Sequence, residues 1–399
     1  MQTEIIEKIA KKEGLVCLSL FDGISCGQQA LTELGINIKS FYASEVDPYP
    51  KAIVAHRFPN TIDVGDVTKL KASDLPDDID ILMGGSPCQG FSFAKGSKDP
   101  DFDDPRSKLF FEFARLVNEL KPKIILLENV PMKAISEEVI TSTLGIDPVM
   151  INSALLSAQN RKRLYWFGIR QEDGTYKTIP VEQPDDLGLV MADILEDDNH
   201  ITDRDKSYCI DANYFKGGNL KQYFDKKRRQ LVFESESLCK QVGVADVQGW
   251  DILKRVYSKY GKGPTCNTGQ GGSRITKILI SKIRDKSKTV RVGGRGSYDR
   301  HEWDSVDNLH WRKLTVLEVE RLQTLPDGYT EFGVFRNAKD YDPTLHEHLQ
   351  KKKISNTRRY KAVGNGWTVS VIKYLFGHLV AEAEQLIIDG HIIEDREVA

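Results

Sequence analysis

The sequence predicts an α/β fold, built on a doubly wound, mostly parallel sheet with a second, smaller, loop-rich domain. From Leu15 to Ile169, short apolar runs alternate with amphipathic helical stretches, a pattern typical of βαβ units around a parallel sheet. After Arg170 this regularity gives way to Pro-, Asp- and Gly-rich stretches, with only short strand candidates until about Arg300. Helical patterning returns at Arg312.

The elements follow in order along the chain. The charged N-terminus, MQTEIIEKIAKKEG, predicts a short helix and lacks the apolar core of a secretory signal. Strands are expected in the runs VCLSLF (16–21), SFYAS (40–44), DILMGG (80–85), KIILLE (123–128), VMINSAL (149–155) and RLYWFGI (163–169). The stretch 108–121 places Leu109, Phe113, Leu116, Val117 and Leu120 on one helical face, so this helix should cover the sheet. It should end at Lys121, because a proline follows.

The C-terminal part predicts two more helices, over 312–325 and 368–387, with a charged and exposed insert over 336–359. We therefore divide the chain into residues 1–185, a second domain over 186–310, and a return segment over 311–399 that completes the first domain. This division agrees with a typical domain length of about 150 residues. With 40% hydrophobic and 29% charged residues, and no apolar run near the ~18 residues of a membrane span, we expect a cytoplasmic protein without membrane contact.

Charge is distributed unevenly along the chain. The net charge is −2, but residues 201–300 hold 22 Lys and Arg against 10 Asp and Glu, which gives +12 there and −14 elsewhere. A basic stretch is often only a solvated surface. Here it also carries tyrosines, Trp250 and Gly-rich stretches, a mixture that favours binding of a polyanion.

Six cysteines occur without any Cys-x-x-Cys pair, which argues against a disulfide framework and against a zinc site. We expect free thiols and no bound metal. One of them, Cys88, lies in GGSPCQGFS (84–92), at the carboxyl end of a predicted strand, where open α/β sheets place reacting groups. Most free cysteines are small buried hydrophobes. The flanking Gly, Ser, Pro and Gln are not core residues, so the Cys88 thiol is a candidate nucleophile.

Two further segments predict a cofactor site. The first strand runs into FDGISCG (21–27), a small-residue turn that opens a helix and lets backbone amides approach a ligand. Glu45 ends the second strand, about 20 residues on, where an acid accepts hydrogen bonds from ribose hydroxyls. The turn lacks the full G-x-G-x-x-G spacing, and these two features alone leave a nicotinamide dehydrogenase as a competitor.

Two polar segments flank the later predicted strands. The next predicted strand after Cys88, KIILLE (123–128), ends in Glu128-Asn129-Val130. This brings a carboxyl group to the sheet edge that carries Cys88. Before the last strand of the run, QNRKR (159–163) points Gln159, Arg161 and Arg163 to one side if it is extended. A basic surface run is the alternative interpretation of that segment.

Taken together, these motifs resemble the cytosine-5 DNA methyltransferase family, bacterial or phage type, in matching order over nearly the whole chain. The resemblance includes RVYS (255–258) to Gly271-Gly272, the family's recognition region, and RKLTVLEVERLQTLP (312–326) to GNGW (364–367). It implies a Rossmann-like S-adenosylmethionine-dependent fold, with 186–310 as target-recognition domain. Gly366 and Trp367 depart from the residues of many members.

The resemblance assigns a role to each site residue. Cys88 would add to carbon 6 of a flipped-out cytosine, Glu128 would contact ring nitrogen 3 and the amine, Arg163 the base oxygen, and Arg161 a phosphate or the catalytic loop. S-adenosylmethionine would be bound by Phe21, Gly23, Ile24, Glu45, Val46, Asp66, Val67, Pro87, Leu109, Asn365 and Trp367. Duplex DNA would be contacted by Gln89, Ser92, Gln159, Gln248, Ser258, Thr265, Gln270 and Arg274.

The resemblance leaves two alternatives open. A tRNA-directed member of the superfamily would share fold, cysteine and cofactor, but has a different context after Pro-Cys-Gln and generally a smaller recognition region. A catalytically inactive DNA-binding homologue is disfavoured by the retention of Cys88, Glu128, Arg161 and Arg163. We expect a monomer, with a cognate restriction endonuclease as a possible separate partner. The target sequence cannot be read from the loops.

Overall fold

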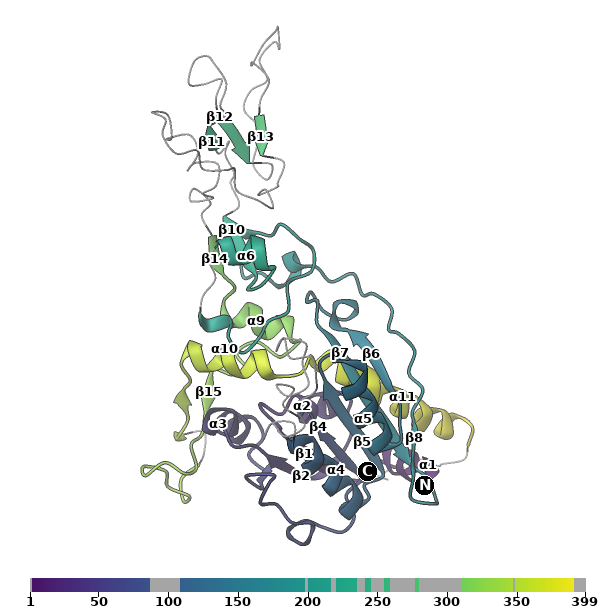
Figure 1. The fold of residues 1–399 in the computed structure, drawn as a ribbon. Coiled ribbons are helices and arrows are strands. Elements are labelled where there is room, and N and C mark those ends of the chain that lie inside the picture. Colours follow the sequence, from purple (N-terminus) through teal and green to yellow (C-terminus); the bar gives the residue numbers. More distant parts are fainter. Residues whose placement is uncertain are drawn as a thin grey trace.

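The computed structural model describes residues 2–86, 108–197, 200–216, 220–234, 241–244, 255–258, 277–279, 311–346 and 349–390 of the chain. Its centre is an eight-stranded sheet in the order β3-β2-β1-β4-β5-β7-β6, with β8 paired to β7 (Figure 1). The strands are β1 (Leu15–Leu20), β2 (Ile38–Ser44), β3 (Ile62–Asp63), β4 (Ile81–Gly84), β5 (Ile124–Asn129), β6 (Pro148–Asn152), β7 (Lys162–Arg170) and β8 (Tyr176–Thr178). All six predicted strands are confirmed.

The sheet is parallel from β3 to β5, and β7 runs antiparallel to β5, β6 and β8. Strand β1 lies between β2 and β4, so the chain continues to opposite sides of β1. In doubly wound sheets the crevice at such a reversal of strand order, beyond the carboxyl ends of the strands, is where ligands bind. The turn after β1 and the loop after β4 both begin at this crevice.

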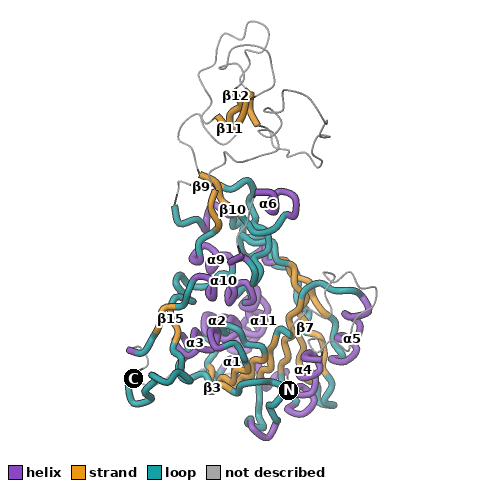
Figure 2. Tube along the Cα trace, turned by 60° about the vertical axis from the view of Figure 1, so that its left-hand side comes forward, coloured by secondary structure: helices purple, strands orange, loops and turns teal. Residues whose placement is uncertain are grey.

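Helices cover both faces of the sheet, which explains why its inner strands are buried throughout (Figures 1 and 2). Alternate residues of β1 enter different cores: Cys17 packs with α1, α2, α3 and α11, whereas Leu18 packs with α4 and α5. These helices are α1 (Gln2–Ala10), α2 (Cys26–Glu33), α3 (Pro48–Arg57), α4 (Lys108–Leu120), α5 (Ala134–Leu144) and α11 (Val369–Ile388). The predicted N-terminal, sheet-covering and terminal helices are confirmed.

The chain after β8 first stays with the main body. Ile194, Ile210, Tyr214 and Val232 all belong to the larger core, although they lie in the range 186–310 that we assigned to a second domain. A three-stranded sheet follows, from β9 (His200–Ile201), β10 (Leu231–Glu234) and β14 (Trp311–Lys313), beside α6 (Leu220–Lys226). A separate small sheet contains β11 (Gln241–Val244), β12 (Arg255–Ser258) and β13 (Lys277–Leu279).

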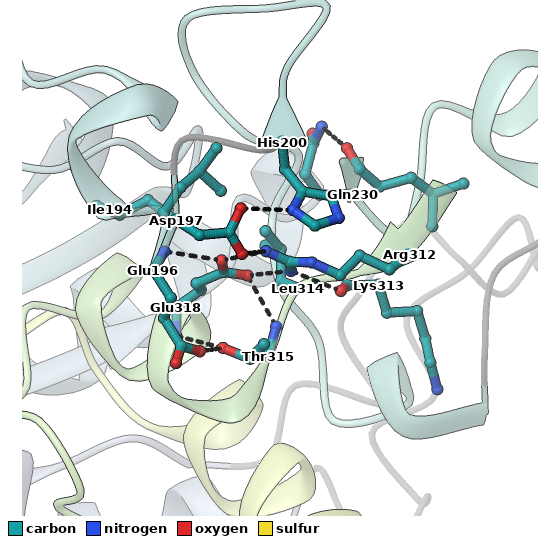
Figure 3. Close-up of polar contacts among 12 residues, drawn as sticks. Ile194, Glu196, Asp197, His200, Gln230, Arg312, Lys313, Leu314, Thr315 and Glu318 are labelled. Carbon is teal, nitrogen blue, oxygen red and sulfur yellow. Dashed lines mark hydrogen bonds and ion pairs between the residues drawn. The ribbon is translucent and has the colours of Figure 1, made fainter. Parts of the chain in front are cut away.

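A polar cluster joins the β9-β10-β14 sheet to α9 (Val316–Leu322), as Figure 3 shows. The buried carboxylate of Glu318 accepts from both terminal nitrogens of Arg312, at 2.7 and 2.8 Å, and from the backbone amide of Thr315 at 2.8 Å. It also accepts from the amide of Glu196 at 3.1 Å. One side chain therefore ties together the segments that lead into and out of the 200–310 region.

The described part of the insert over 336–359 is mostly exposed, as we expected, and regular structure frames it. Strand β15 (Phe332–Gly333), just before the insert, pairs with β16 (Lys352–Lys353) in a hairpin, and α10 (Asn356–Asn365) follows. Ile354 and Arg359 are buried, and Arg359 forms a 3.0 Å ion pair with the buried Glu320. Short 3-10 turns complete the described elements: Ala72–Asp74, Ser153–Leu155, Met191–Ile194 and Tyr214–Lys216. Among the described residues, no helix combines the length and apolar character that crossing a membrane requires.

Candidate active site and cofactor cavity

The turn after β1 has an unusual backbone. Phe21, Gly23 and Ser25 all have positive φ angles, of 56°, 60° and 54°. This left-handed conformation is free for glycine but costs energy for residues with side chains, and such strain concentrates at functional sites. A Cβ atom at Gly23 would have no atom of the described residues within 4 Å, so they leave the space beside the turn open.

Glu45, at the end of β2, is held against this turn. Its Oε2 atom accepts from the amide of Gly23 at 3.0 Å, and its Oε1 atom accepts from the amides of Val46 and Asp47 at 2.7 Å. The next side chain, Val46, is 70% exposed. An oriented carboxylate next to an uncovered apolar side chain suits a nucleoside, since the acid can accept from ribose hydroxyls while the apolar group covers part of the ligand.

Asp22, inside the turn, has a polar atom without a partner. Its Oδ1 atom is buried and forms no hydrogen bond within the part of the chain that the structure describes. Burial raises the pKa of Asp22 to about 6, and the nearby Glu45 carboxylate adds to the shift. A cationic ligand group such as the ammonium of an amino acid would complete the bonding of this carboxylate and favour its charged form.

A cavity of about 760 Å³ opens beside the turn. Asp22, Gly23, Glu45 and Val46 line one side of it. Other lining residues were not predicted as site residues: Pro48, Lys51, Ala52 and Asp63 from α3 and β3, and the segment 334–338 with Lys352 from the hairpin. The open turn, the oriented acid and the unpartnered Asp22 atom together fit an S-adenosylmethionine-like ligand, which combines a ribose with an amino-acid cation.

The carboxyl group of Glu128 lies next to Gly85, where the loop that carries Cys88 begins. Glu128 is 8% exposed, and its Oε1 atom forms a 2.9 Å ion pair with Nε of Arg163. A Cβ atom at Gly85 would lie 3.1 Å from Oε2 of Glu128 and 2.8 Å from Nε1 of Trp367, so a glycine is needed there. Asn129 donates to the carbonyl and hydroxyl oxygens of Ser86, at 3.4 and 3.3 Å.

The Cys88 loop itself lies outside the described residues, and Pro87, Gln89 and Ser92 lie outside them too. Its start is nevertheless fixed by the contacts of Gly85 and Ser86. Burial is the largest single effect and opposes the charge of Arg163, but Glu128, Cys209 and Tyr165 together outweigh it and hold the pKa of Arg163 above its usual value. Glu128, paired with Arg163, therefore lies beside Gly85, which precedes the predicted nucleophile by three residues in sequence.

The residue range that matches a known family covers most of the chain. The model of the C-5 cytosine-specific DNA methylase family matches residues 15–381. The chain belongs to this family. The enzyme class predicted from the motifs, DNA (cytosine-5-)-methyltransferase, is confirmed by this match and by curated relatives.

Several relatives of this methylase are curated. The orphan methyltransferase M.SPBetaI of Bacillus phage SPbeta is 28% identical, with 91% of this chain and 97% of the relative covered. The type II methyltransferase M.NgoBV of Neisseria gonorrhoeae is 32% identical over 78% of this chain and 68% of the relative. The solved structure of the methyltransferase EhMeth of Entamoeba histolytica agrees in fold, with a TM-score of 0.52, 16% identity, and coverage of 92% of this chain and 99% of that one.

In this methylase Arg161 and Gln159 are structural parts of the site wall. Arg161 is 4% exposed and donates to the carbonyl oxygens of Ile210, at 3.0 Å, and Gly366, at 2.9 Å. Gln159 is 0% exposed, donates to the Leu322 carbonyl and accepts from the Ile210 amide. The prediction that Gln159 contacts DNA conflicts with this burial, because all of its surface faces protein. The contacts of Arg161 are likewise with backbone rather than phosphate.

The other predicted cofactor residues lie at varied positions. Ile24 and Val67 are buried, Phe21, Leu109 and Trp367 are partly buried, and Asn365 is exposed. Asp66 accepts from the amide and hydroxyl of Thr68, at 3.0 and 2.8 Å, and these bonds lower its pKa. Its carboxylate thus caps its own turn. None of these described residues is among those that line the cavity: Phe21, Ile24, Asp66, Val67, Leu109, Asn365 and Trp367.

Of the residues predicted to read DNA, Ser258 ends β12, while Gln248, Thr265, Gln270 and Arg274 lie outside the described residues. Of the three cysteines among the described residues, two are buried. Burial raises the pKa of Cys26 to about 12 and that of Cys17 further, so both stay protonated. Cys209 is exposed, and its Sγ atom lies 3.5 Å from Nη1 of Arg161. No sequence motif marks Cys209. No candidate metal cluster occurs among the described residues.

Proposed function

We propose that this methylase transfers a methyl group from S-adenosylmethionine to carbon 5 of a flipped-out cytosine, within a specific sequence of duplex DNA, through a covalent adduct of Cys88. The observation that carries the proposal is the position of Glu128, paired to Arg163 and adjacent to Gly85, at the start of the Cys88 loop. This arrangement would let the Cys88 nucleophile and the Glu128 acid act on the same cytosine ring.

The chemistry requires the groups that this chain provides. Carbon 5 of cytosine is a weak nucleophile, so the Cys88 thiolate would first add to carbon 6 and make carbon 5 electron-rich. Glu128 would donate to ring nitrogen 3 and hold the exocyclic amine, which stabilises the charge that develops on addition. Arg163 would hold the base oxygen. S-adenosylmethionine, when bound, supplies an electrophilic methyl group. Loss of the carbon 5 proton to water, departure of the thiolate and return of the nitrogen 3 proton to Glu128 would then restore the ring and the free enzyme.

The cofactor would lie beside the turn after β1. The amide of Gly23 and the carboxylate of Glu45 are positioned for its ribose, and Val46 offers an exposed apolar surface. Asp22 would accept from its ammonium group. Because Cys88 cannot reach carbon 6 within a stacked duplex, the target base would have to swing out. The +12 region over 201–300 would hold the DNA backbone, with 186–310 acting as the target-recognition domain.

The proposal is tested with purified protein and S-adenosylmethionine labelled in the methyl group. We expect label in duplex DNA that contains cytosine and none in tRNA, and we expect Cys88→Ser to abolish turnover. DNA with 5-fluorocytosine at the target should trap a covalent complex with the wild type, since the fluorine blocks proton loss. Label only in tRNA, or full activity of the Cys88→Ser variant, contradicts the proposal.

The target sequence and biological role need a separate experiment. Bisulfite sequencing of DNA from cells that express the protein would report both the modified base and its sequence context. The names of some relatives describe orphan methyltransferases and others type II methyltransferases. A cytoplasmic enzyme, with or without a partner endonuclease, agrees with both kinds of relative, and we propose that it acts as a monomer.

A further inference from the structure

The cofactor cavity has a second wall that the family motifs do not include. Its lining residues come from the turn after β1 and the end of β2 on one side, and from Val334, Phe335, Arg336, Asn337 and Ala338 on the other. We infer that this segment, defined here as the hairpin wall (residues 334–338), contacts the ribose side of bound S-adenosylmethionine and determines how tightly cofactor and product are held. This inference rests on the proposed function.

The hairpin wall is anchored to α3, the helix that follows Glu45. The amide of Val334 donates to the carbonyl of Ala52 at 2.8 Å, and a Cβ atom at Gly333 would meet the backbone and side chain of Ala52 at 3.0 Å. The Phe335 ring packs edge-on against Tyr49, with centroids 5.7 Å apart. Arg336 donates to the carbonyl of Pro59 at 2.6 Å. The wall is therefore placed by contacts of its own rather than by a ligand.

The hairpin wall is also coupled to the cofactor turn. Tyr329, five residues before Val334, is buried, and its hydroxyl donates to the carbonyl of Ile24 at 2.8 Å. Arg57, at the end of α3, donates to the carbonyl of Tyr329 at 2.9 Å and lies over its ring. The turn, α3 and the start of the hairpin therefore form one packed unit around the cavity.

The charges of the cavity favour a cationic ligand. Its three basic side chains have protein partners: Lys51 pairs with Asp63 at 2.6 Å, Lys352 pairs with Asp340 at 2.5 Å, and Arg336 binds the Pro59 carbonyl. Asp22 keeps a buried oxygen without a partner among the described residues. A ligand with a sulfonium or ammonium group would meet acids here, while the exposed amide of Asn337 can bond to a ribose hydroxyl.

The test measures binding of S-adenosylhomocysteine, the product, to the full-length protein by titration calorimetry. Phe335→Ala and Asn337→Ala should each weaken binding about threefold to tenfold, the loss expected for one contact. Lys339→Ala is the matched control, because this exposed residue belongs to the same hairpin but does not line the cavity. It should bind like the wild type. Asn337 is exposed, so its replacement does not threaten the fold.

A second readout is hydrogen exchange of the full chain, with and without S-adenosylhomocysteine. Exchange in 334–338 should slow on binding, while exchange in 339–346 should not change. If the wild type binds S-adenosylhomocysteine, both variants bind it with unchanged affinity and residues 334–338 gain no protection, the inference about the hairpin wall is wrong. The proposed cofactor would then still stand. Absence of any binding by the wild type would overturn the proposed cofactor and this inference with it.

Discussion

Arg163 and Glu128 form an ion pair across two antiparallel strands, with 2.9 Å between Nε and Oε1. The register of β5 and β7 explains the pair: Glu128 lies opposite Tyr165, so Arg163 is its diagonal neighbour on the same face. The strand pairing thus builds the carboxyl group that we propose to be catalytic into the sheet. A loop residue could not be oriented as strictly.

The first prediction concerns the Glu128 carboxyl group. Glu128→Gln keeps the size of the side chain but removes its acid function, so turnover should fall about 10²- to 10⁴-fold, the range for one acid or base group. Methyl transfer from labelled cofactor measures turnover, and a filter-binding assay should give an unchanged DNA affinity. Glu138→Gln, at an exposed position on α5, is the control and should be fully active. Equal loss of DNA binding and turnover would argue against a chemical role.

The second prediction separates Arg161 from a direct DNA contact. Arg161→Lys cannot reach both Ile210 and Gly366, so it leaves buried carbonyl groups unpaired and should lower the free energy of unfolding by about 2 kcal/mol. Chemical denaturation monitored by circular dichroism measures the loss. Lys162→Ala, the exposed neighbour, should have no such effect. If the Arg161→Lys variant had wild-type stability but bound DNA much more weakly, the result would support the phosphate contact predicted from the sequence.

The sequence predicted the sheet well because its strands are continuous apolar runs between polar turns. It did not predict α3, whose segment contains two prolines and little helical periodicity. Two local signals were available: Asp47 caps the helix by accepting from the Tyr49 amide, and Pro48 occupies the first turn. The insert over 336–359 is mostly exposed, as its charge content predicted, but the burial of Arg359 was not foreseen. Its partner Glu320 is distant in sequence, and charge content cannot reveal such a pair.

The candidate site shows the same contrast between features set by nearby residues and features set by distant ones. The conformation around Glu45 depends on residues within about 20 positions, so motif spacing was sufficient to find it. Arg161 bonds to Gly366, 205 residues away in sequence, and Gln159 packs against Leu322. Nothing in the QNRKR run distinguishes these buried partners from a phosphate. The hairpin wall has no motif at all, and only folding brings it to the cavity.

The third prediction compares a buried ion pair with an exposed one. Glu320 has no exposed surface, pairs with Arg359, and accepts from the amides of Gly328 and Thr330 at 2.9 Å. Glu320→Ala leaves a buried cation unpaired and should cost about 3–5 kcal/mol of stability. Glu331→Ala removes only a 3.6 Å surface pair with Lys353 and should cost less than about 1 kcal/mol. Urea denaturation of both variants makes the comparison, and equal midpoints would contradict it.

The fourth prediction uses the titration of Asp22. Its pKa of about 6 lies above the ordinary 3.8, so the ligand-free fold binds this proton more tightly than the unfolded chain does. Ionised Asp22 therefore destabilises the fold above pH 6, by about 3 kcal/mol for this difference in pKa, and the penalty fades as the pH falls from 6 towards 4. Asp22→Asn should raise the melting temperature most at pH 8 and about a third as much at pH 4.5, where the penalty has fallen to about 1 kcal/mol. The same variant should bind S-adenosylhomocysteine more weakly at pH 8, because it cannot pair with the ammonium group. Equal gains in melting temperature at both pH values would show that Asp22 does not titrate in this range.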